Sequence, residues 1–152
     1  SRGGASKSNV FTRILLALLR ISVGGDAVDS FRAGATRNAL AVVSPGGVTT
    51  ATYRVAESGF GLDRMALHPG TGLPTEGFAV PQWEDVRALV LRAAAVFAPL
   101  RAVGWDVAPT DEGPVLVEAN AWWAVASTPA GDTLPVLRAL REAVGPQSRA
   151  TA

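Results

Sequence analysis

The chain has 152 residues, of which 48% are hydrophobic, so one domain with a buried core is expected. Its 14 Lys and Arg residues and 13 Asp and Glu residues leave a net charge of +1, which argues against nucleic acid as a partner. The absence of Cys excludes disulfides, thiolate-bound metals and Cys nucleophiles. A single His, His68, also excludes a His-rich metal site.

Membrane insertion is not expected. The longest uninterrupted apolar run, Ile14 to Leu19, is far shorter than the roughly 20 residues that cross a bilayer. No small-residue cleavage site follows an apolar stretch near the N-terminus, as a secretory signal would require. The sequence therefore predicts a cytoplasmic protein without a membrane span.

The N-terminal part of the chain is partly ambiguous. Residues 1–9 are rich in Gly and Ser and predict a flexible tail. Val10 to Val23 leaves two alternatives, because its apolar residues fit one face of a helix and equally well a short buried strand. Residues 29–34 then have the composition of a polar loop.

A hairpin and a long loop are predicted next. Ala39 to Ser44 and the β-branched run Val48 to Val55 flank the turn Pro45-Gly46-Gly47, a pattern typical of a β-hairpin. Glu57 to Phe78 is rich in Gly and contains His68, and it predicts a long irregular excursion over the surface.

One long helix and a second hairpin follow. Apolar residues recur at helical spacing from Val86 to Phe97, after an acidic first turn and before Pro99. Val103 to Ala108 and Val115 to Asn120 predict the second hairpin, and 133–144 predicts a short terminal helix. The expected fold class is α+β, a mainly antiparallel sheet of hairpins with one long amphipathic helix packed on it. We expect this lobe to span 10–145, followed by a flexible tail, 146–152.

The second hairpin concentrates oxygen-bearing side chains. Glu118 and Asn120, two residues apart on one strand, point to the same face. With an odd number of loop residues, Asp106 lies opposite residue 116 or 118 and joins that face. Carboxylate and amide oxygens suit a Mg²⁺ ion that takes its remaining ligands from water and nucleotide phosphates. The alternative is that these acids are simply solvated.

The apolar neighbours of these acids favour the metal. Five of them are expected to be buried: Trp105, Val107, Val115, Leu116 and Val117. Acids lodged among buried apolar groups need a compensating cation.

The segments Gly104 to Ala108 and Asp111 to Asn120 resemble the C-terminal metal-binding hairpin of the ATP-grasp superfamily. The closer resemblance is to the branch that is associated with sugar transfer and related to α-L-glutamate ligases. Other segments echo its pattern in order: Leu19-Arg20-Ile21, Val28-Asp29-Ser30-Phe31, His68-Pro69-Gly70-Thr71-Gly72, Val80-Pro81-Gln82-Trp83 and Trp122-Trp123. The resemblance covers about residues 14–125 and implies that the ambiguous N-terminal segment is a strand. The chain has Asp29-Ser30 where the family usually has Asp-Asn, and Gly34-Ala35 where it tends to have Gly-Gly.

The resemblance implies an ATP-dependent carboxylate–amine ligase that acts through an acylphosphate, in polysaccharide or peptide modification. Its cofactors would be Mg²⁺ and ATP, and its substrates ATP and a carboxylate. Carried over to this chain, Asp106, Glu118 and Asn120 would hold Mg²⁺, and Asn120 would also face the nucleotide.

The remaining carried-over residues are basic or acidic groups near the N-terminus. Arg20 would be the catalytic candidate at the phosphate or acylphosphate. An equally weighted alternative is that Arg20 is a strand-end arginine that anchors a surface carboxylate. Asp29 and Arg32 would face the substrate or the nucleotide. His68 has two readings, a substrate contact or, more commonly, loop packing.

An ATP-grasp enzyme clamps ATP between two lobes, and the first lobe does not fit upstream of the first predicted element. We therefore expect the C-terminal lobe alone, which is a ligase only when an N-terminal lobe complements it. Apolar surface left uncovered by the missing lobe predicts self-association or instability. The alternative function is a truncated, non-catalytic ATP-grasp remnant that binds a partner or glycan through Trp122, Trp123 and exposed loops. Hydrolysis by Asp106 and Glu118 as paired carboxylates ranks last, because it does not explain Asn120.

Overall fold

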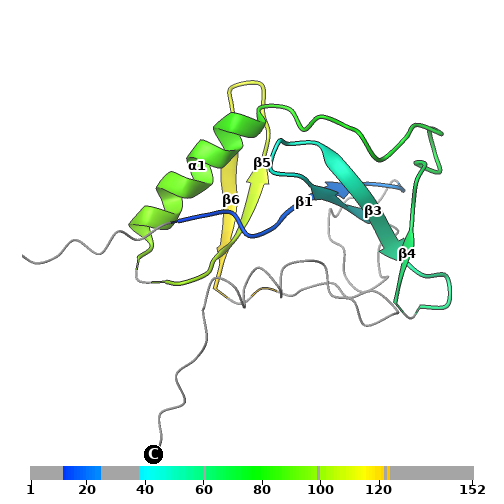
Figure 1. Ribbon diagram of the computed structural model, residues 1–152, viewed down its shortest axis with the longest axis horizontal. Coiled ribbons are helices and arrows are strands. Elements are labelled where there is room, and N and C mark those ends of the chain that lie inside the picture. The colour runs from blue at the N-terminus through cyan, green and yellow to red at the C-terminus, as the bar shows by residue number, and fades with distance from the viewer. Residues whose placement is uncertain (1–11, 25–37, 60, 99, 122, 124–152) are drawn as a thin grey trace, which may run out of the picture.

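The computed structural model describes residues 12–24, 38–59, 61–98, 100–121 and 123. These residues form a four-stranded sheet, a two-stranded sheet and one helix (Figure 1). The elements, in chain order, are β1 (Ala17–Ile21), β2 (Ala39–Val43), β3 (Thr49–Val55), β4 (Leu62–Arg64), α1 (Trp83–Val96), β5 (Gly104–Ala108) and β6 (Val115–Asn120). The predicted α+β class is confirmed. The predicted tails 1–9 and 146–152, the polar loop 29–34 and the terminal helix 133–144 lie outside the described residues.

The ambiguous segment 10–23 contributes a strand. β1 pairs antiparallel with β2, so that Ala17 lies opposite Val43 and Ile21 lies opposite Ala39. β1 is an edge strand of the larger sheet, whose order is β1-β2-β3-β4. The strand confirms the alternative that the ATP-grasp resemblance implied, and it places Arg20 on an edge of the sheet.

The first predicted hairpin, β2–β3, is confirmed. Its turn contains Gly47 at φ 81, a left-handed conformation that glycine adopts without steric cost. A Cβ at Gly47 would collide with the side chain of Trp83, which lies against it. The indole Nε1 of Trp83 donates a hydrogen bond to the carbonyl of Pro45 at 2.9 Å. The turn is therefore the docking point for the first residue of α1.

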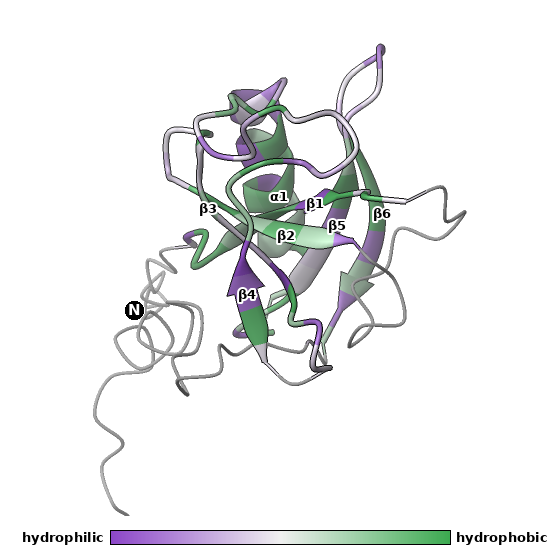
Figure 2. Cartoon of the chain, turned by 90° about the vertical axis from the view of Figure 1, so that its right-hand side faces the viewer, coloured by the Kyte–Doolittle hydropathy of each residue, from purple (hydrophilic) through white to green (hydrophobic). Residues whose placement is uncertain are grey.

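The core lies around β2, one of the two inner strands of the larger sheet. Its buried apolar residues are Ala39, Leu40, Ala41, Val43, Leu62, Met65 and Val90. In Figure 2, β2 has the colour of a hydrophobic strand. Burial of this small apolar set is the main favourable term that holds the sheet together.

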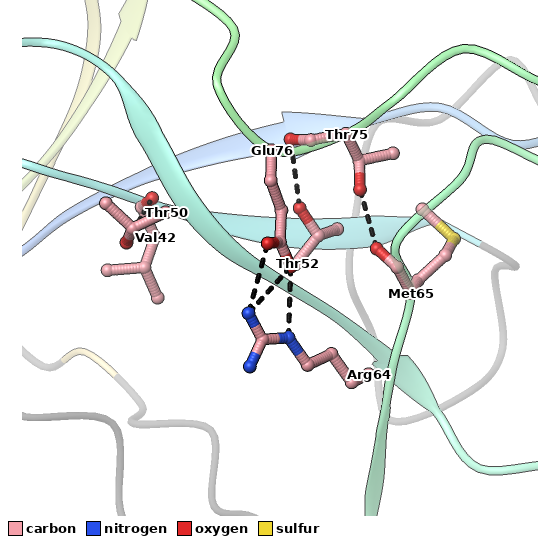
Figure 3. A network of polar contacts seen from close by, with 7 residues as sticks. All are labelled: Val42, Thr50, Thr52, Arg64, Met65, Thr75 and Glu76. Carbon is pink, nitrogen blue, oxygen red and sulfur yellow. Dashed lines mark hydrogen bonds and ion pairs between the residues drawn. The ribbon is translucent and has the colours of Figure 1, made fainter.

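Threonines complete the core, and each of their buried hydroxyls is hydrogen bonded. Thr52 Oγ1 donates to the carbonyl of Thr75 at 3.3 Å, and Thr75 Oγ1 donates to the carbonyl of Met65 at 2.6 Å (Figure 3). No buried side-chain nitrogen or oxygen of the described residues lacks a partner. This satisfaction matters because an unpaired buried polar group costs about 1–3 kcal/mol.

The segment 57–78 is more regular than the sequence predicts. It contains β4, which pairs antiparallel with β3, and an isolated bridge between Leu67 and Pro74. Gly77 N donates to the carbonyl of Thr49 at 2.8 Å, so the end of the segment also returns to β3. The prediction of an irregular segment holds for most of these residues but misses β4, because Gly-rich turns here reverse the chain and let it pair with the sheet.

The long helix is confirmed and joins the two sheets. It begins at Trp83 and has Glu84 and Asp85 in its first turn, as expected for the positive end of a helix dipole. Gln82, which precedes it, has the left-handed φ of 54 and no capping hydrogen bond from its side chain. The Gln82 amide instead donates to the carbonyl of Thr110, in the β5–β6 turn, at 2.8 Å. The start of α1 is thus hydrogen bonded to the turn of the β2–β3 hairpin through Trp83 and to the β5–β6 turn through Gln82.

The two-stranded sheet lies against this helix (Figure 1). Phe97, which follows the last turn, meets Trp105 of β5 edge to face, with ring centroids 5.3 Å apart and planes at 78°. This geometry is the favourable one for an aromatic pair. No helix in the described part of the chain is long and apolar enough to cross a membrane.

Candidate metal and phosphate site

The register of the β5–β6 hairpin brings the predicted ligands together. Asp106 lies directly opposite Glu118, and Gly104 lies opposite Asn120. Since side chains alternate along a strand, Asp106, Glu118 and Asn120 share one face. Trp105 belongs to the other face, which contacts Phe97 beyond the end of α1. The hairpin therefore has an apolar face toward the helix and an oxygen-rich face, which we call the acidic face.

A β-bulge produces this register. The loop between the paired residues Ala108 and Val115 is 109–114, an even number of residues, whereas an odd number was expected. Without an irregularity, Asp106 would lie opposite Val117, and Glu118 would point toward the helix. The register shifts between Asp106 and Val107, which makes Val117 the extra residue on β6. The predicted juxtaposition is thus confirmed, but its cause is a bulge, which turns side chains at sheet rims.

The hairpin is less buried than its sequence predicts. Val115 is 51% exposed and Val117 is 67% exposed, whereas both were expected to be buried. Val115 flanks the turn on the acidic face, and Val117 occupies the bulge. Neither valine therefore belongs to the face of the hairpin that lies toward the helix. Trp105 and Leu116 are half-buried, in better agreement with the prediction. The acids are therefore open to ligands rather than enclosed by apolar side chains.

Arg20 reaches the acidic face from the other sheet. Its Nη2 donates to Oδ2 of Asp106 at 3.0 Å, across 86 positions of the sequence. The side chains are 42% and 33% exposed, respectively. The structure thus joins the predicted catalytic arginine to a predicted metal ligand, and it agrees with both readings of Arg20, a phosphate-site residue and an anchor for a carboxylate.

Two predicted residues cannot be placed. Asp29 and Arg32 lie outside the described residues. They follow β1 in the sequence, and their proposed role toward substrate or nucleotide stays a prediction.

His68 organises the loop that borders the end of β1. Its Nε2 lies 2.8 Å from the carbonyl oxygen of Ser22, two residues beyond Arg20. Its Nδ1 accepts hydrogen bonds from the backbone N–H groups of Gly70 and Thr71, both at 3.2 Å. Nε2 is therefore the protonated nitrogen in this arrangement, because Nδ1 faces two donors. The contacts favour the loop-packing reading of His68 and hold the loop to the chain next to Arg20.

Trp123 borders the acidic face, a placement that sequence reasoning missed. A Cβ on Gly104 would lie 3.2 Å from Cβ and 3.3 Å from Cγ of Trp123. That Cβ would point to the same face as Asp106, since the two residues are two apart on β5. The indole thus occupies space that a side chain at position 104 would fill. The only sequence signal was a glycine inside a predicted strand, which often marks a close approach of another group.

The donor set suits a hard divalent cation with an incomplete protein shell. Two carboxylates face each other across the strands, and like charges in this position repel unless a cation compensates them. Within the described residues no group of three or more His, Asp or Glu side chains could hold a metal. Mg²⁺ fits this arrangement because it commonly takes one or two carboxylates and completes its octahedron with water and phosphate oxygens. Asp106, Glu118 and Asn120 are the residues that would hold it.

Fold and site define a class of protein: an α+β lobe that presents an oxygen-rich hairpin and an arginine on the same side. Residues 8–137 match the sugar-transfer associated ATP-grasp family, and the chain belongs to this family. ATP binding is implied by the family as a whole. No curated protein and no solved structure matches the chain.

Proposed function

We propose that this chain supplies the metal- and phosphate-binding surface of an ATP-dependent ligase. The observation that carries the proposal is the convergence of Asp106, Glu118 and Asn120 on one face, with Arg20 bound to it. Membership of an ATP-grasp family supports ATP as the ligand of that face. The reaction class follows from the resemblance: a carboxylate substrate takes the γ-phosphate of ATP, and an amine then displaces phosphate from the acylphosphate.

The residues of the acidic face have distinct tasks in this scheme. Asp106 and Glu118 supply charge that holds a divalent cation, and Asn120 supplies a neutral amide oxygen beside them. A bound Mg²⁺ would neutralise charge on the phosphate oxygens during transfer. Arg20 provides a fixed positive charge and several donors at the rim of the same face, which suits a phosphoryl group. Trp123 limits the access of water from the side of Gly104.

The test is a calorimetric titration of the chain with ATP, with and without Mg²⁺. We expect binding that depends on Mg²⁺. Asp106→Asn and Glu118→Gln should each weaken it by at least about tenfold, because each variant keeps its shape and removes a charged ligand. Asp111→Asn is the matched control, since Asp111 lies in the turn of the same hairpin and is exposed.

The control separates a specific site from a general effect of charge. If Asp111→Asn lowers the affinity as much as Asp106→Asn, attraction by net charge explains the binding and the proposed site is wrong. If the folded chain shows no binding with Mg²⁺, the non-catalytic remnant becomes the better account of this protein.

A further inference from the structure

The contact between Arg20 and Asp106 differs from three other ion pairs of the described residues. Arg54–Glu57, Arg64–Glu76 and Arg87–Glu84 join residues that are close in the sequence. Arg20 and Asp106 instead connect the edge strand of one sheet with the acidic face of the other. The pair thus places a guanidinium, itself a cation, at the site proposed for a metal.

The acidic face needs a cation even when no metal is bound. Asp106 and Glu118 are direct cross-strand partners, an arrangement that like charges destabilise. The guanidinium of Arg20, 3.0 Å from Asp106, acts as a counterion for this pair. Arg20 thus pairs with the carboxylate of Asp106, which would also be a ligand of a divalent cation.

The ion pair between Arg20 and Asp106 can separate at little cost in stability. Both side chains are a third or more exposed, and ion pairs of this kind contribute little to stability. Their separation would therefore leave the fold intact. A polyphosphate offers the guanidinium a stronger partner than one carboxylate oxygen, because phosphate accepts two parallel hydrogen bonds from arginine.

From these contacts we infer that Arg20 is an exchangeable counterion, which leaves Asp106 for a nucleotide phosphate when a divalent cation occupies the acidic face. This inference rests on the proposed function. It has a thermodynamic consequence: a cation alone competes with Arg20 for Asp106, whereas a cation together with ATP gives Arg20 a new partner. Metal and nucleotide should then strengthen each other's binding, and Arg20 should carry much of that coupling.

The experiment uses Mn²⁺ as a probe of the metal site, titrated by electron paramagnetic resonance with and without ATP. The variant is Arg20→Met, which keeps length and removes the charge. We expect Arg20→Met to bind Mn²⁺ alone about two- to fivefold more tightly, because its competitor is gone. The gain in Mn²⁺ affinity on adding ATP should fall by about tenfold, because a charge-assisted contact to phosphate is lost.

These opposite changes distinguish the inference from a structural role for Arg20, which would weaken both affinities together. Arg87→Met is the matched control, since it breaks an exposed ion pair on α1 and should change neither affinity. If Arg20→Met binds Mn²⁺ alone equally well or more weakly than the unmodified chain, the proposed exchange of Arg20 is wrong. The metal site itself is tested separately, and loss of Mn²⁺ binding in Glu118→Gln would support it. If the unmodified chain binds no Mn²⁺ with or without ATP, the exchange and the proposed function both fail.

Discussion

The four-stranded sheet and the β5–β6 hairpin each contain a β-bulge, but the side chains that the two bulges redirect differ in chemistry. In β3 the shift near Thr50 leaves Thr49 and Thr52, three residues apart, both buried in the core. In β6 the shift at Val117 places Glu118 opposite Asp106 on an open face. The bulge in β3 therefore directs side chains into the core, and the bulge in β6 directs Glu118 toward Asp106.

Most of the buried core and the proposed metal ligands thus lie in different sheets. The buried apolar residues cluster around β2 and the threonine hydroxyls beside it are all paired, whereas the hairpin holds two exposed valines and a pair of facing carboxylates. Active regions are expected to lie where local stability is low. Substitutions in the buried core of the larger sheet should thus change unfolding, and substitutions of Arg20 and of the acidic face should change binding.

The largest expected effect is on the docking of α1 at the first hairpin. Gly47→Ala should lower the free energy of unfolding by about 2–4 kcal/mol, because it adds a left-handed alanine and a collision with Trp83. Urea unfolding followed by tryptophan fluorescence measures this change.

Two other glycines separate the conformational and steric parts of that effect. Gly59 also has a positive φ, of 78, but nothing lies near its absent Cβ, so Gly59→Ala should cost only about 1 kcal/mol. Gly46 has only Ser44 Oγ nearby, at 3.9 Å, and Gly46→Ala should be nearly neutral. Similar losses at positions 47 and 59 would show that Trp83 does not lie against the turn.

The second effect concerns the buried threonines in and beside the larger sheet. Thr75→Val should destabilise the chain by about 1–2 kcal/mol, because the carbonyl of Met65 loses its donor in a buried place. Thr50→Val removes an exposed hydroxyl that donates a hydrogen bond to the carbonyl of Val42 at 3.3 Å. It should lower the free energy of unfolding by well under about 0.5 kcal/mol. Equal costs in urea unfolding would contradict the placement of Thr75 in the core.

The smallest effect is expected from removing the bulge itself. Deletion of Val117 leaves Asp106 opposite Glu118 in a regular ladder, so Mn²⁺ affinity should stay within about threefold. Deletion of Ala119 keeps Glu118 in place but moves Asn120 to the helix face, and it should weaken Mn²⁺ binding clearly. Loss of binding in the Val117 deletion would mean that the bulge shapes the site beyond setting the register.

Local patterns allowed the prediction of most elements. Turn residues around Pro45 and the helical spacing of apolar residues before Phe97 each depend on neighbours in the sequence, so both elements were predictable. The strand β1 stayed open because a short apolar run satisfies two periods, and only its pairing with β2 decides between them. β4 was missed because three residues between glycine-rich turns carry too little pattern.

The candidate site was predicted in composition but not in detail. The Glu-x-Asn spacing predicts a shared face for Glu118 and Asn120, because it follows from strand geometry alone. The position of a bulge, the ion pair of Arg20 with Asp106 and the approach of Trp123 to Gly104 depend on contacts between distant segments. Such contacts have no local signature in a single sequence.

The central claim is that a divalent cation binds the acidic face of the hairpin and not another part of the chain. Paramagnetic broadening of backbone amide signals by substoichiometric Mn²⁺ tests it most directly. We predict selective broadening at Asp106, Glu118 and Asn120, weaker broadening at Arg20, and sharp signals throughout β3 and β4. Uniform broadening, or broadening centred on the larger sheet, would contradict the account.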